Sequence, residues 1–349
     1  MKHIIFGGNG FVGRYIARDL LARGEQVLVC DKIKSDLPVY EYAQFIETDV
    51  CDADAVGHVP VESDDIIYNM AARLLMPPIK KKDRYKTFYP VHIDGPGNIL
   101  ERMDRAGANK MVQFSTDMVY GRSTMPPPIP STHPRNPIDA YGKSKKECED
   151  LCRSWRERGI NISLFRPRMI MGPGRLGLLQ NLFRLIDANL LVPTIGNGKN
   201  RYQFISVFDC SSFAVQAADL GCPNGEWNLG SVNAPSVREL LQRLIRHAGS
   251  RSFVLPTPAF AVKTVLAALD AIDHPLLTRE QYAIANEDYV VDVEDLRDVF
   301  GRVPSGTDEE MIIAAFDEYR KYHGDPDALY RAFAANDAWN TFTAKKSCA

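Results

Sequence analysis

A short apolar run that leads directly into a glycine-rich loop constrains this fold more than any other feature of the sequence. Residues 4–6 (Ile-Ile-Phe) are followed at once by the loop GGNGFVG at residues 7–13, and apolar residues then recur every four positions at Val12, Ile16 and Leu20. A strand, a tight turn and a helix are therefore expected to follow one another at the start of the chain.

The spacing of the glycines, GxxGxxG, is typical of a turn that holds a diphosphate against the N-terminus of a helix. Gly7 would make the tight turn, Gly10 would let phosphates approach the backbone, and Gly13 would let the helix pack closely on the strand. A glycine triplet alone is a weak signal, but its position at the first strand-to-helix junction makes it specific. We therefore expect a dinucleotide site here.

The alternation of apolar runs and helical patterns continues through the first 170 residues. Helical stripes such as Ile99, Leu100 and Met103 separate the runs. Repetition of strand and helix predicts an α/β protein, a Rossmann-type doubly wound parallel sheet covered by helices on both faces. The β-rich runs are residues 4–7, 26–30, 44–46, 65–70, 110–115 and 161–166.

After Gly172 the alternation loosens into loops and longer helices, which indicates a smaller C-terminal substrate lobe. The predicted cofactor domain comprises residues 1–170, with 208–230 returning to it. The predicted substrate lobe comprises residues 171–207 and 231–318. The remaining residues, 319–349, form a C-terminal tail with Tyr330, Phe333 and Trp339, which fits a docking helix or an oligomer contact.

Composition excludes several classes of function. The 349 residues carry 42 Lys and Arg against 44 Asp and Glu, so the net charge of -2 gives no reason to expect nucleic acid or an anionic membrane as a partner. The seven cysteines lack metal-ligand spacing, so we expect no metal site and a reducing, cytoplasmic compartment. The apolar stretch 258–272 is interrupted by Lys263 and Asp270 and is too short to cross a bilayer of about 30 Å. It predicts a buried or partner-facing helix.

The second apolar run ends at Asp31, eighteen residues after Gly13. A carboxylate here can accept hydrogen bonds from the adenosine ribose and would repel a 2′-phosphate, which favours NAD over NADP. Lys32 and Lys34 follow at once and weaken that preference, because a basic side chain could pair with a phosphate. Further cofactor contacts are expected from position at Phe11, Val12, Asp49, Val50, Met70, Ala71 and Ala72.

A phenol and an ammonium group stand four residues apart at Tyr141 and Lys145, and hence on one face of a helix. A tyrosine with a pKa near 10 can take a proton from an alcohol at neutral pH only if a cation stabilises its phenolate. Lys145 and a nicotinamide ring would supply that field. Thr116, at the end of the run 110–115, is well placed to bind the reacting oxygen, because ligands of doubly wound sheets sit at the carboxyl ends of strands.

Four motifs together resemble the extended short-chain dehydrogenase/reductase family: GGNGFVG at 7–13, STDMVYG at 115–121, YGKSK at 141–145 and RPRMIMGP at 166–173. The resemblance covers residues 1–305 in order. It implies bound NAD, a catalytic set of Thr116, Tyr141 and Lys145, cofactor contacts from Tyr141, Lys145 and Pro167, and a homodimer. Many members of the family act in carbohydrate metabolism on nucleotide-diphosphate sugars, oxidising a ring hydroxyl to a ketone before re-reduction, loss of water or loss of carbon dioxide.

The residues after Thr116 favour one of these outcomes. Members similar to sugar dehydratases and decarboxylases place a glutamate where this chain has Met118, and a thioether cannot abstract a proton. A nucleotide-sugar epimerase, an isomerase that needs no extra base there, or a simple oxidoreductase is therefore the leading interpretation. Asp117 and Met118 are expected to contact the substrate, while Asn181 and Arg201 resemble the diphosphate contacts of such epimerases.

Two alternatives stay open. A hydroxysteroid or other apolar-alcohol dehydrogenase of the same superfamily predicts net NADH production and an apolar pocket without paired basic residues. A catalytically silent NAD-binding accessory protein is disfavoured by the intact set of Thr116, Tyr141 and Lys145.

The family pattern NVxGTxN is changed in this chain, because His92 replaces an asparagine and Pro96 a threonine, so helix geometry or a proton relay could differ. His92 fits a relay or a hydrogen-bonded core histidine.

Overall fold

The centre of the molecule is a seven-stranded sheet in which neighbouring strands run parallel, in the order β10-β6-β5-β4-β1-β2-β3. The computed structural model describes residues 1–34, 42–74, 79–176 and 179–324. The strand order reverses between β1 and β4, as in a Rossmann-type sheet, which confirms the predicted fold class. The strands are β1 (His3–Phe6), β2 (Val27–Asp31), β3 (Gln44–Glu47), β4 (Ile66–Asn69), β5 (Lys110–Phe114), β6 (Asn161–Pro167) and β10 (Gly225–Leu229).

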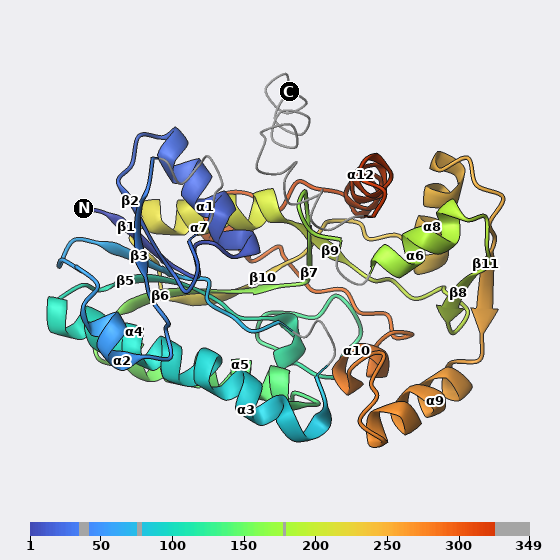
Figure 1. The fold of residues 1–349 in the computed structure, drawn as a ribbon, viewed down its shortest axis with the longest axis horizontal. Coiled ribbons are helices and arrows are strands. Elements are labelled where there is room, and N and C mark those ends of the chain that lie inside the picture. The colour runs from blue at the N-terminus through green and yellow to red at the C-terminus, as the bar shows by residue number, and fades with distance from the viewer. Residues whose placement is uncertain (35–41, 75–78, 177–178, 325–349) are drawn as a thin grey trace.

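Helices cover both faces of the sheet (Figure 1). On one face lie α1 (Phe11–Ala22) and α7 (Val207–Asp219), and on the other α2 (Ala53–Gly57), α4 (Gly95–Ala106) and α5 (Ala140–Arg156). Side chains of each strand alternate between the two cores: Ile5 packs with the first set of helices, whereas Ile4 and Phe6 pack with the second. Burial on both faces explains why these strands are almost continuously apolar.

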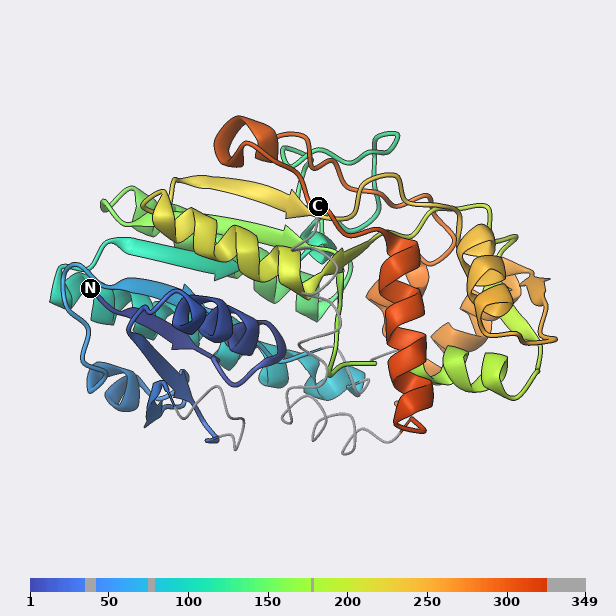
Figure 2. The same cartoon turned by 90° about the horizontal axis from the view of Figure 1, so that it is seen from above.

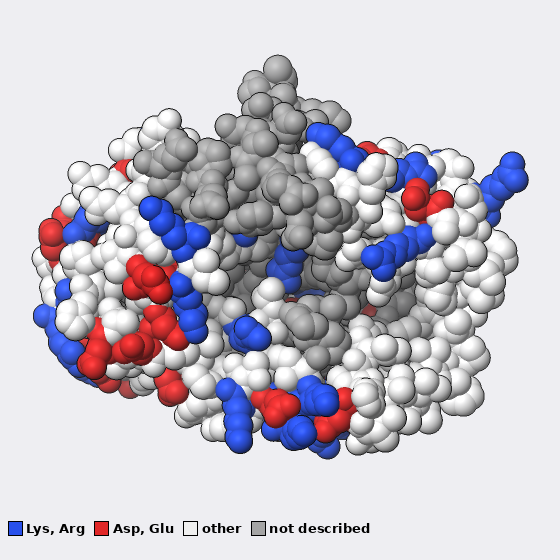
Figure 3. Space-filling view, in the orientation of Figure 1, with Lys and Arg blue, Asp and Glu red and all other residues white. Residues whose placement is uncertain are grey.

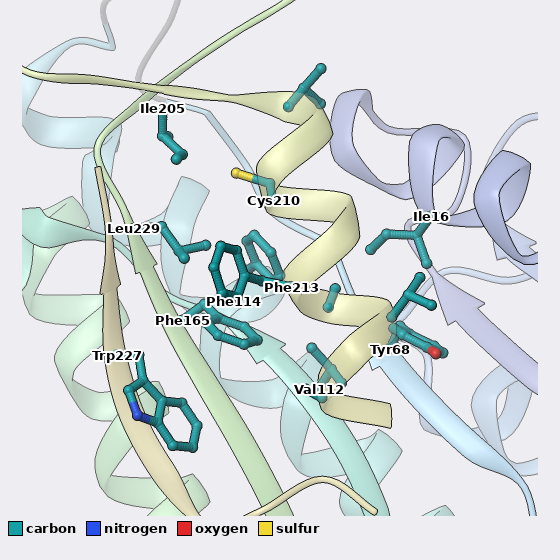
Figure 4. Close-up of a cluster of buried hydrophobic side chains, with 14 of the residues drawn as sticks. Ile16, Tyr68, Val112, Phe114, Phe165, Ile205, Cys210, Phe213, Trp227 and Leu229 are labelled. Carbon is teal, nitrogen blue, oxygen red and sulfur yellow. The ribbon is translucent and has the colours of Figure 1, made fainter. Parts of the chain in front are cut away.

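Aromatic side chains fill the core beneath α7 (Figure 4). Phe213 of α7 faces Phe114 of β5 and Phe165 of β6, and the Phe165 ring lies 5.8 Å from that of Trp227 on β10. Each such side chain stabilises the fold by about 1.5–3 kcal/mol when fully buried. The carboxyl ends of β5 and β6 are therefore held on a rigid support.

The lobe has its own small core. Strand β7 (Met169–Met171) pairs with β9 (Phe204–Ser206), and β8 (Val192–Ile195) pairs with β11 (Val254–Thr257). A separate apolar cluster around Phe183, Leu244 and Phe316 joins α6 (Leu179–Asp187), α8 (Val237–His247) and α12 (Asp308–Lys321). Figure 2 shows α12 standing between the sheet domain and the rest of the lobe. Residues 325–349, with the tail aromatics named above, lie outside the described residues.

One stretch of helix changes its winding. Helix α3 (Arg84–Tyr89) continues through a π-helical turn, Pro90–Asp94, into α4. Pro90 and Pro96 each lack a backbone N–H, so the regular ladder of hydrogen bonds cannot run through this segment. The sequence flagged this helix because of Pro96, and the wider turn carries the buried His92.

Helix α9 (Ala259–Ala271) is not buried, so of the two predicted possibilities only a partner-facing helix stays open. Phe260 and Val265 are 78% and 59% exposed. Its two charged side chains turn inward, because Lys263 donates to the Ala283 carbonyl and Asp270 pairs with Arg84. The surface over α9 consequently shows few charges (Figure 3). Among the described residues, no helix has the length and apolar character needed to span a bilayer.

Arg84 joins three helices, α3, α5 and α9. Its guanidinium, buried at the start of α3, pairs with Asp139, the N-cap of α5, and with Asp270 of α9. Two shorter helices complete the fold: α10 (Arg279–Ala283) packs on α9, and α11 (Leu296–Phe300) packs on α7 of the sheet domain. Single 3-10 turns lie at Lys81–Asp83 and Asp117–Val119.

Candidate active site

A cavity of about 530 Å³ lies at the carboxyl ends of the central strands, between the sheet and the lobe. The sheet side contributes the glycine loop through Gly10, Phe11 and Val12, and the loop after β4 through Met70 and Ala72. Thr116, Tyr141 and Lys145, the residues expected to react, also line it. The remaining wall comes from the lobe.

The glycine loop has the bare backbone that a dinucleotide requires. A Cβ on Gly7, whose φ is +72°, would lie 2.5 Å from the Ala71 nitrogen, and a Cβ on Gly13 would lie 2.5 Å from the Gly7 oxygen. Helix α1 begins at Gly10 with no side-chain cap and no acidic residue in its first turn. Its first N–H groups can therefore face an anion, so the residues present fit the diphosphate of NAD.

Asp31 lies at the end of β2, above this loop. Its carboxylate accepts hydrogen bonds from the backbone N–H groups of Asn9, at 2.9 Å, and Lys32, at 2.8 Å. The Lys32 ammonium instead pairs with Asp49 at 2.6 Å, so it is drawn away from a phosphate role beside Asp31. Val50 is buried against Gly95 of α4, and neither Asp49 nor Val50 is among the described residues that line the cavity.

Thr116, Tyr141 and Lys145 line the same cavity, together with Pro167. Thr116 follows β5, while Tyr141 and Lys145 lie on the first turns of α5, which Asp139 caps by accepting from the Ala140 N–H at 2.8 Å. The Lys145 ammonium donates to the Phe114 carbonyl at 3.1 Å. The fold thus brings Thr116 into the same cavity as Lys145, which follows it by 29 positions in the sequence.

Burial raises the pKa of Tyr141 well above 10, and the nearby carboxylates of Glu280 and Asp117 raise it further. The Arg175 guanidinium and a hydrogen bond with Thr116 lower it. Burial also lowers the pKa of Lys145. The cation that lowers the pKa of Tyr141 is Arg175, which sequence reasoning missed. The expectation that Lys145 provides a cationic field on the phenol stays a prediction. The signal for Arg175 was its place just after the GP pair at 172–173.

His92 joins the loop after β4 to helix α5. Its Nε2 accepts from the Arg73 N–H at 3.1 Å, and its Nδ1 lies 2.8 Å from Ser144 Oγ. Ser144 in turn donates to the Tyr141 carbonyl at 2.8 Å. Because Nε2 accepts a hydrogen bond, the geometry assigns the proton of the neutral ring to Nδ1. Burial lowers the pKa of His92 well below its usual value, so the ring is neutral.

Glu280 is a residue near the site that the sequence analysis did not predict. Its carboxyl accepts from the Gly142 N–H at 2.7 Å and the Asp139 N–H at 3.2 Å, and it therefore holds the first turn of α5. Burial raises its pKa to about 7. A buried carboxyl group in contact with the helix that carries Tyr141 could only be recognised once α10 was placed beside α5.

The lobe wall of the cavity is almost entirely apolar. Thr194, Tyr202 and Gln281 are its polar members apart from two arginines. The apolar side chains are Met169, Ile170, Met171, Leu176, Leu179, Leu182, Pro193, Ile195, Phe204, Val237, Leu240, Leu241, Leu277, Ala285 and Ile312.

The two arginines of the cavity differ in their surroundings. Arg168 pairs with Asp117 and stacks between Tyr202 and Tyr289, with distances of 4.6 and 4.7 Å to the ring centroids. Asp117 and Met118, both expected to contact the substrate, line the cavity, and the Asp117 carboxylate is also paired with the buried Arg168. Arg175 has no carboxylate within ion-pair distance among the described residues.

Asn181 and Arg201, expected to contact a substrate diphosphate, lie elsewhere. Arg201 forms a two-pronged pair with Asp288, with N–O distances of 2.7 and 2.9 Å, on the exposed surface. In an extended segment successive side chains face opposite sides, and Tyr202 takes the cavity side. On α6, Leu179 and Leu182 face the cavity, which turns Asn181 to solvent. This part of the prediction is not supported by the geometry.

The chain is similar in sequence to known proteins. The pattern of the NAD dependent epimerase/dehydratase family matches residues 3–230. The chain is 28% identical to the uncharacterized protein y4nG of Sinorhizobium fredii, over 91% of this chain and 78% of that protein. It is 27% identical to a dTDP-glucose 4,6-dehydratase of Streptomyces niveus (72% and 78%) and 24% identical to a 2-alkyl-3-oxoalkanoate reductase of Stenotrophomonas maltophilia (72% and 76%).

Solved structures show the same fold. The Bordetella bronchiseptica enzyme WbmG, determined in complex with NAD and UDP, superposes with a TM-score of 0.68 at 20% identity, over 92% of this chain and 94% of that one. The glycine cradle, the parallel sheet and the family match over most of the cofactor domain lead to one conclusion. This chain belongs to the NAD-dependent epimerase/dehydratase family, a group of extended short-chain dehydrogenase/reductase enzymes.

Proposed function

We propose that this protein oxidises a secondary hydroxyl group of its substrate to a ketone and can reduce the ketone again. The observation that carries the proposal is that Thr116, Tyr141 and Lys145 line one cavity with the glycine loop. Bound NAD supplies the acceptor for the hydride that leaves the carbinol carbon. The protein must then move one proton and hold the reacting oxygen in place.

Tyr141 is the group that moves the proton. In oxidation its phenolate takes the hydroxyl proton, and in reduction its phenol returns a proton to the ketone oxygen. Because the pKa of Tyr141 is raised in the structure, the phenol is the resting form, and the cationic groups Arg175 and Lys145 must favour its ionisation when the alcohol is oxidised. The Thr116 hydroxyl would hydrogen-bond the reacting oxygen. The Lys145 ammonium, which donates to the Phe114 carbonyl, would act on the phenol from the next turn of α5.

The first candidate substrate is a nucleotide-diphosphate sugar, whose ring hydroxyl would be oxidised and re-reduced with inversion. The family match and the nucleotide-sugar enzymes among the relatives support it. Met118 offers no base for an elimination, so epimerisation is the outcome that these residues favour. A cytoplasmic homodimer, as the family resemblance implies, completes this proposal.

The second candidate is an alcohol or ketone on an apolar framework, and the lobe wall of the cavity favours it. A substrate diphosphate in the lobe would place two negative charges against side chains such as Leu179, Leu182 and Leu240. Arg168 is already neutralised by Asp117, and Arg175 lies against Phe11 of the glycine loop. Burying unpaired charge of this kind is strongly unfavourable. The similarity to a reductase of 2-alkyl-3-oxoalkanoates supports the same class. For the substrate lobe, the apolar lining of the cavity therefore favours this second candidate over the nucleotide sugar that the family resemblance implies.

The experiment that separates the candidates measures turnover on two panels. UDP-, CDP-, GDP- and dTDP-sugars would be followed for conversion to their epimers, and apolar secondary alcohols and ketones of increasing chain length for formation or consumption of NADH. Inversion in the first panel supports the epimerase, and net redox change in the second supports the dehydrogenase. Bound NAD without turnover in either panel would contradict the proposed function.

A further inference from the structure

We propose that Arg175 binds the diphosphate of NAD from the lobe side, opposite the glycine loop. The proposal rests on the NAD-binding function given above. Residues 172–176 form a tight turn after β7, closed by the pairing of Gly172 with Arg175. This turn places the Arg175 guanidinium 5.4 Å from the centroid of the Phe11 ring, at the first position of α1. Arg175 and the glycine loop therefore line the same part of the cavity.

The half-buried Arg175 differs in its charge partners from three fully buried arginines. Those three have carboxylate partners: Arg84 pairs with Asp139 and Asp270, Arg166 with Glu149 and Glu226, and Arg168 with Asp117. Arg175 has no such partner among residues 1–34, 42–74, 79–176 and 179–324, and burial lowers its pKa. A desolvated guanidinium without a counter-ion is stabilised by an anion that enters the cavity.

The position of the anion follows from the two walls. Helix α1 directs uncapped N–H groups into the cavity, beginning at Phe11, and its first turn has no acidic residue to oppose an anion. The Phe11 ring lies under the guanidinium, so an anion held by these N–H groups lies beside Arg175. The planar fork of an arginine suits phosphate oxygens. A substrate anion farther into the lobe would meet apolar side chains instead.

This arrangement would let one ligand hold both halves of the molecule together. The N-terminus of α1 belongs to the sheet domain, whereas Arg175 lies on the turn that leads from β7 into α6 of the lobe. Cofactor binding would then hold the turn against the glycine loop. Arg175 is thus a specific contact for the cofactor that also affects the reacting phenol.

The test compares the wild type with Arg175→Gln and Arg175→Lys by calorimetric titration without substrate. The ligands are NAD, ADP-ribose, which keeps the diphosphate, and adenosine, which lacks it. Arg201→Gln is the matched control, because that lobe arginine lies outside the cavity and pairs with Asp288. We expect Arg175→Gln to weaken NAD and ADP-ribose about 10- to 100-fold, with adenosine unchanged and Arg175→Lys intermediate.

Other results would overturn the assignment. Unchanged affinity of Arg175→Gln for NAD and ADP-ribose would mean that Arg175 does not bind the diphosphate. An equal loss for adenosine would mean that the substitution distorts the cavity. Since these titrations need no turnover, they remain decisive even if the proposed reaction is wrong, and circular dichroism of each variant verifies that it is folded.

Discussion

His92 Nδ1 lies 2.8 Å from Ser144 Oγ, one turn along α5 from the phenol of Tyr141. The ring also packs edge-on against Tyr141, with centroids 5.5 Å apart, and stacks on Phe88 at 5.6 Å. Through its other nitrogen it holds the backbone of Arg73, just past the cofactor loop. We therefore expect His92 to act as a positioning residue that fixes the Tyr141 phenol relative to bound NAD.

Replacement of His92 by Phe keeps a ring of similar shape but removes both hydrogen bonds. We expect kcat to fall roughly 10- to 100-fold because the phenol is less well placed, and the free energy of unfolding to fall by about 1–3 kcal/mol because the Arg73 N–H loses its partner. His92→Asn, which restores the residue usual in the family, should recover part of the loss. Kinetics and urea denaturation measure both effects; unchanged kcat in His92→Phe would exclude a positioning role.

Replacement of Tyr141 by Phe removes the proton-transfer group and leaves the cofactor cradle intact. Turnover should decrease by at least about 100-fold, the usual contribution of general acid–base catalysis. The affinity for NAD should change little, because the glycine loop and Asp31 are untouched. Titration with NAD and initial rates test this pair of expectations, and substantial turnover in the variant would remove Tyr141 from the mechanism.

The stability of the protein should depend on pH through Glu280. Its pKa is raised from 4.5 in the unfolded chain to about 7 in the folded one, so the folded state binds more protons between these values. The free energy of unfolding should therefore decrease as the pH rises from about 4.5 to about 7, by up to about 3 kcal/mol from this group. Glu280→Gln keeps the acceptor for the Gly142 N–H and should flatten this part of the curve. Urea denaturation of both proteins across the pH range gives the difference, and identical curves would refute the assignment.

Loss of the carboxylate of Asp117 should destabilise the fold more than any change to a surface ion pair. Asp117→Asn leaves the buried Arg168 guanidinium without a counter-charge, at an expected loss of about 3–5 kcal/mol in the free energy of unfolding. Asp288→Asn breaks the exposed pair with Arg201 and should lose less than about 1 kcal/mol. Equal losses of stability in the two variants would show that an unpaired Arg168 costs no more than an unpaired surface arginine.

The sequence predicted what depends on local pattern. The strand before Gly7 and the apolar run ending in Asp31 follow from residue types at adjacent positions, and the YGKSK spacing places Tyr141 and Lys145 on one helical face. These expectations need no knowledge of distant contacts. The glycine loop could therefore be assigned before the sheet was seen.

The rest depends on contacts between distant residues. Arg201 resembled a phosphate ligand, but its partner Asp288 stands 87 positions later and the alternation that turns it outward is set by Tyr202. Both roles of His92 require the loop after β4 and helix α5 to meet at one ring. The exposure of Phe260 likewise follows from the ties that Lys263 and Asp270 make with other elements.

The Arg84 guanidinium that joins Asp139 to Asp270 has a consequence for how the molecule comes apart on heating. Fraying of the first turn of α5 would break the link to α9, and detachment of α9 would leave the N-cap of α5 beside an unpaired cation. Neither the first turn of α5 nor helix α9 can detach alone without leaving a buried charge unpaired. The sheet domain and the lobe should therefore melt as one cooperative unit, with a single calorimetric transition.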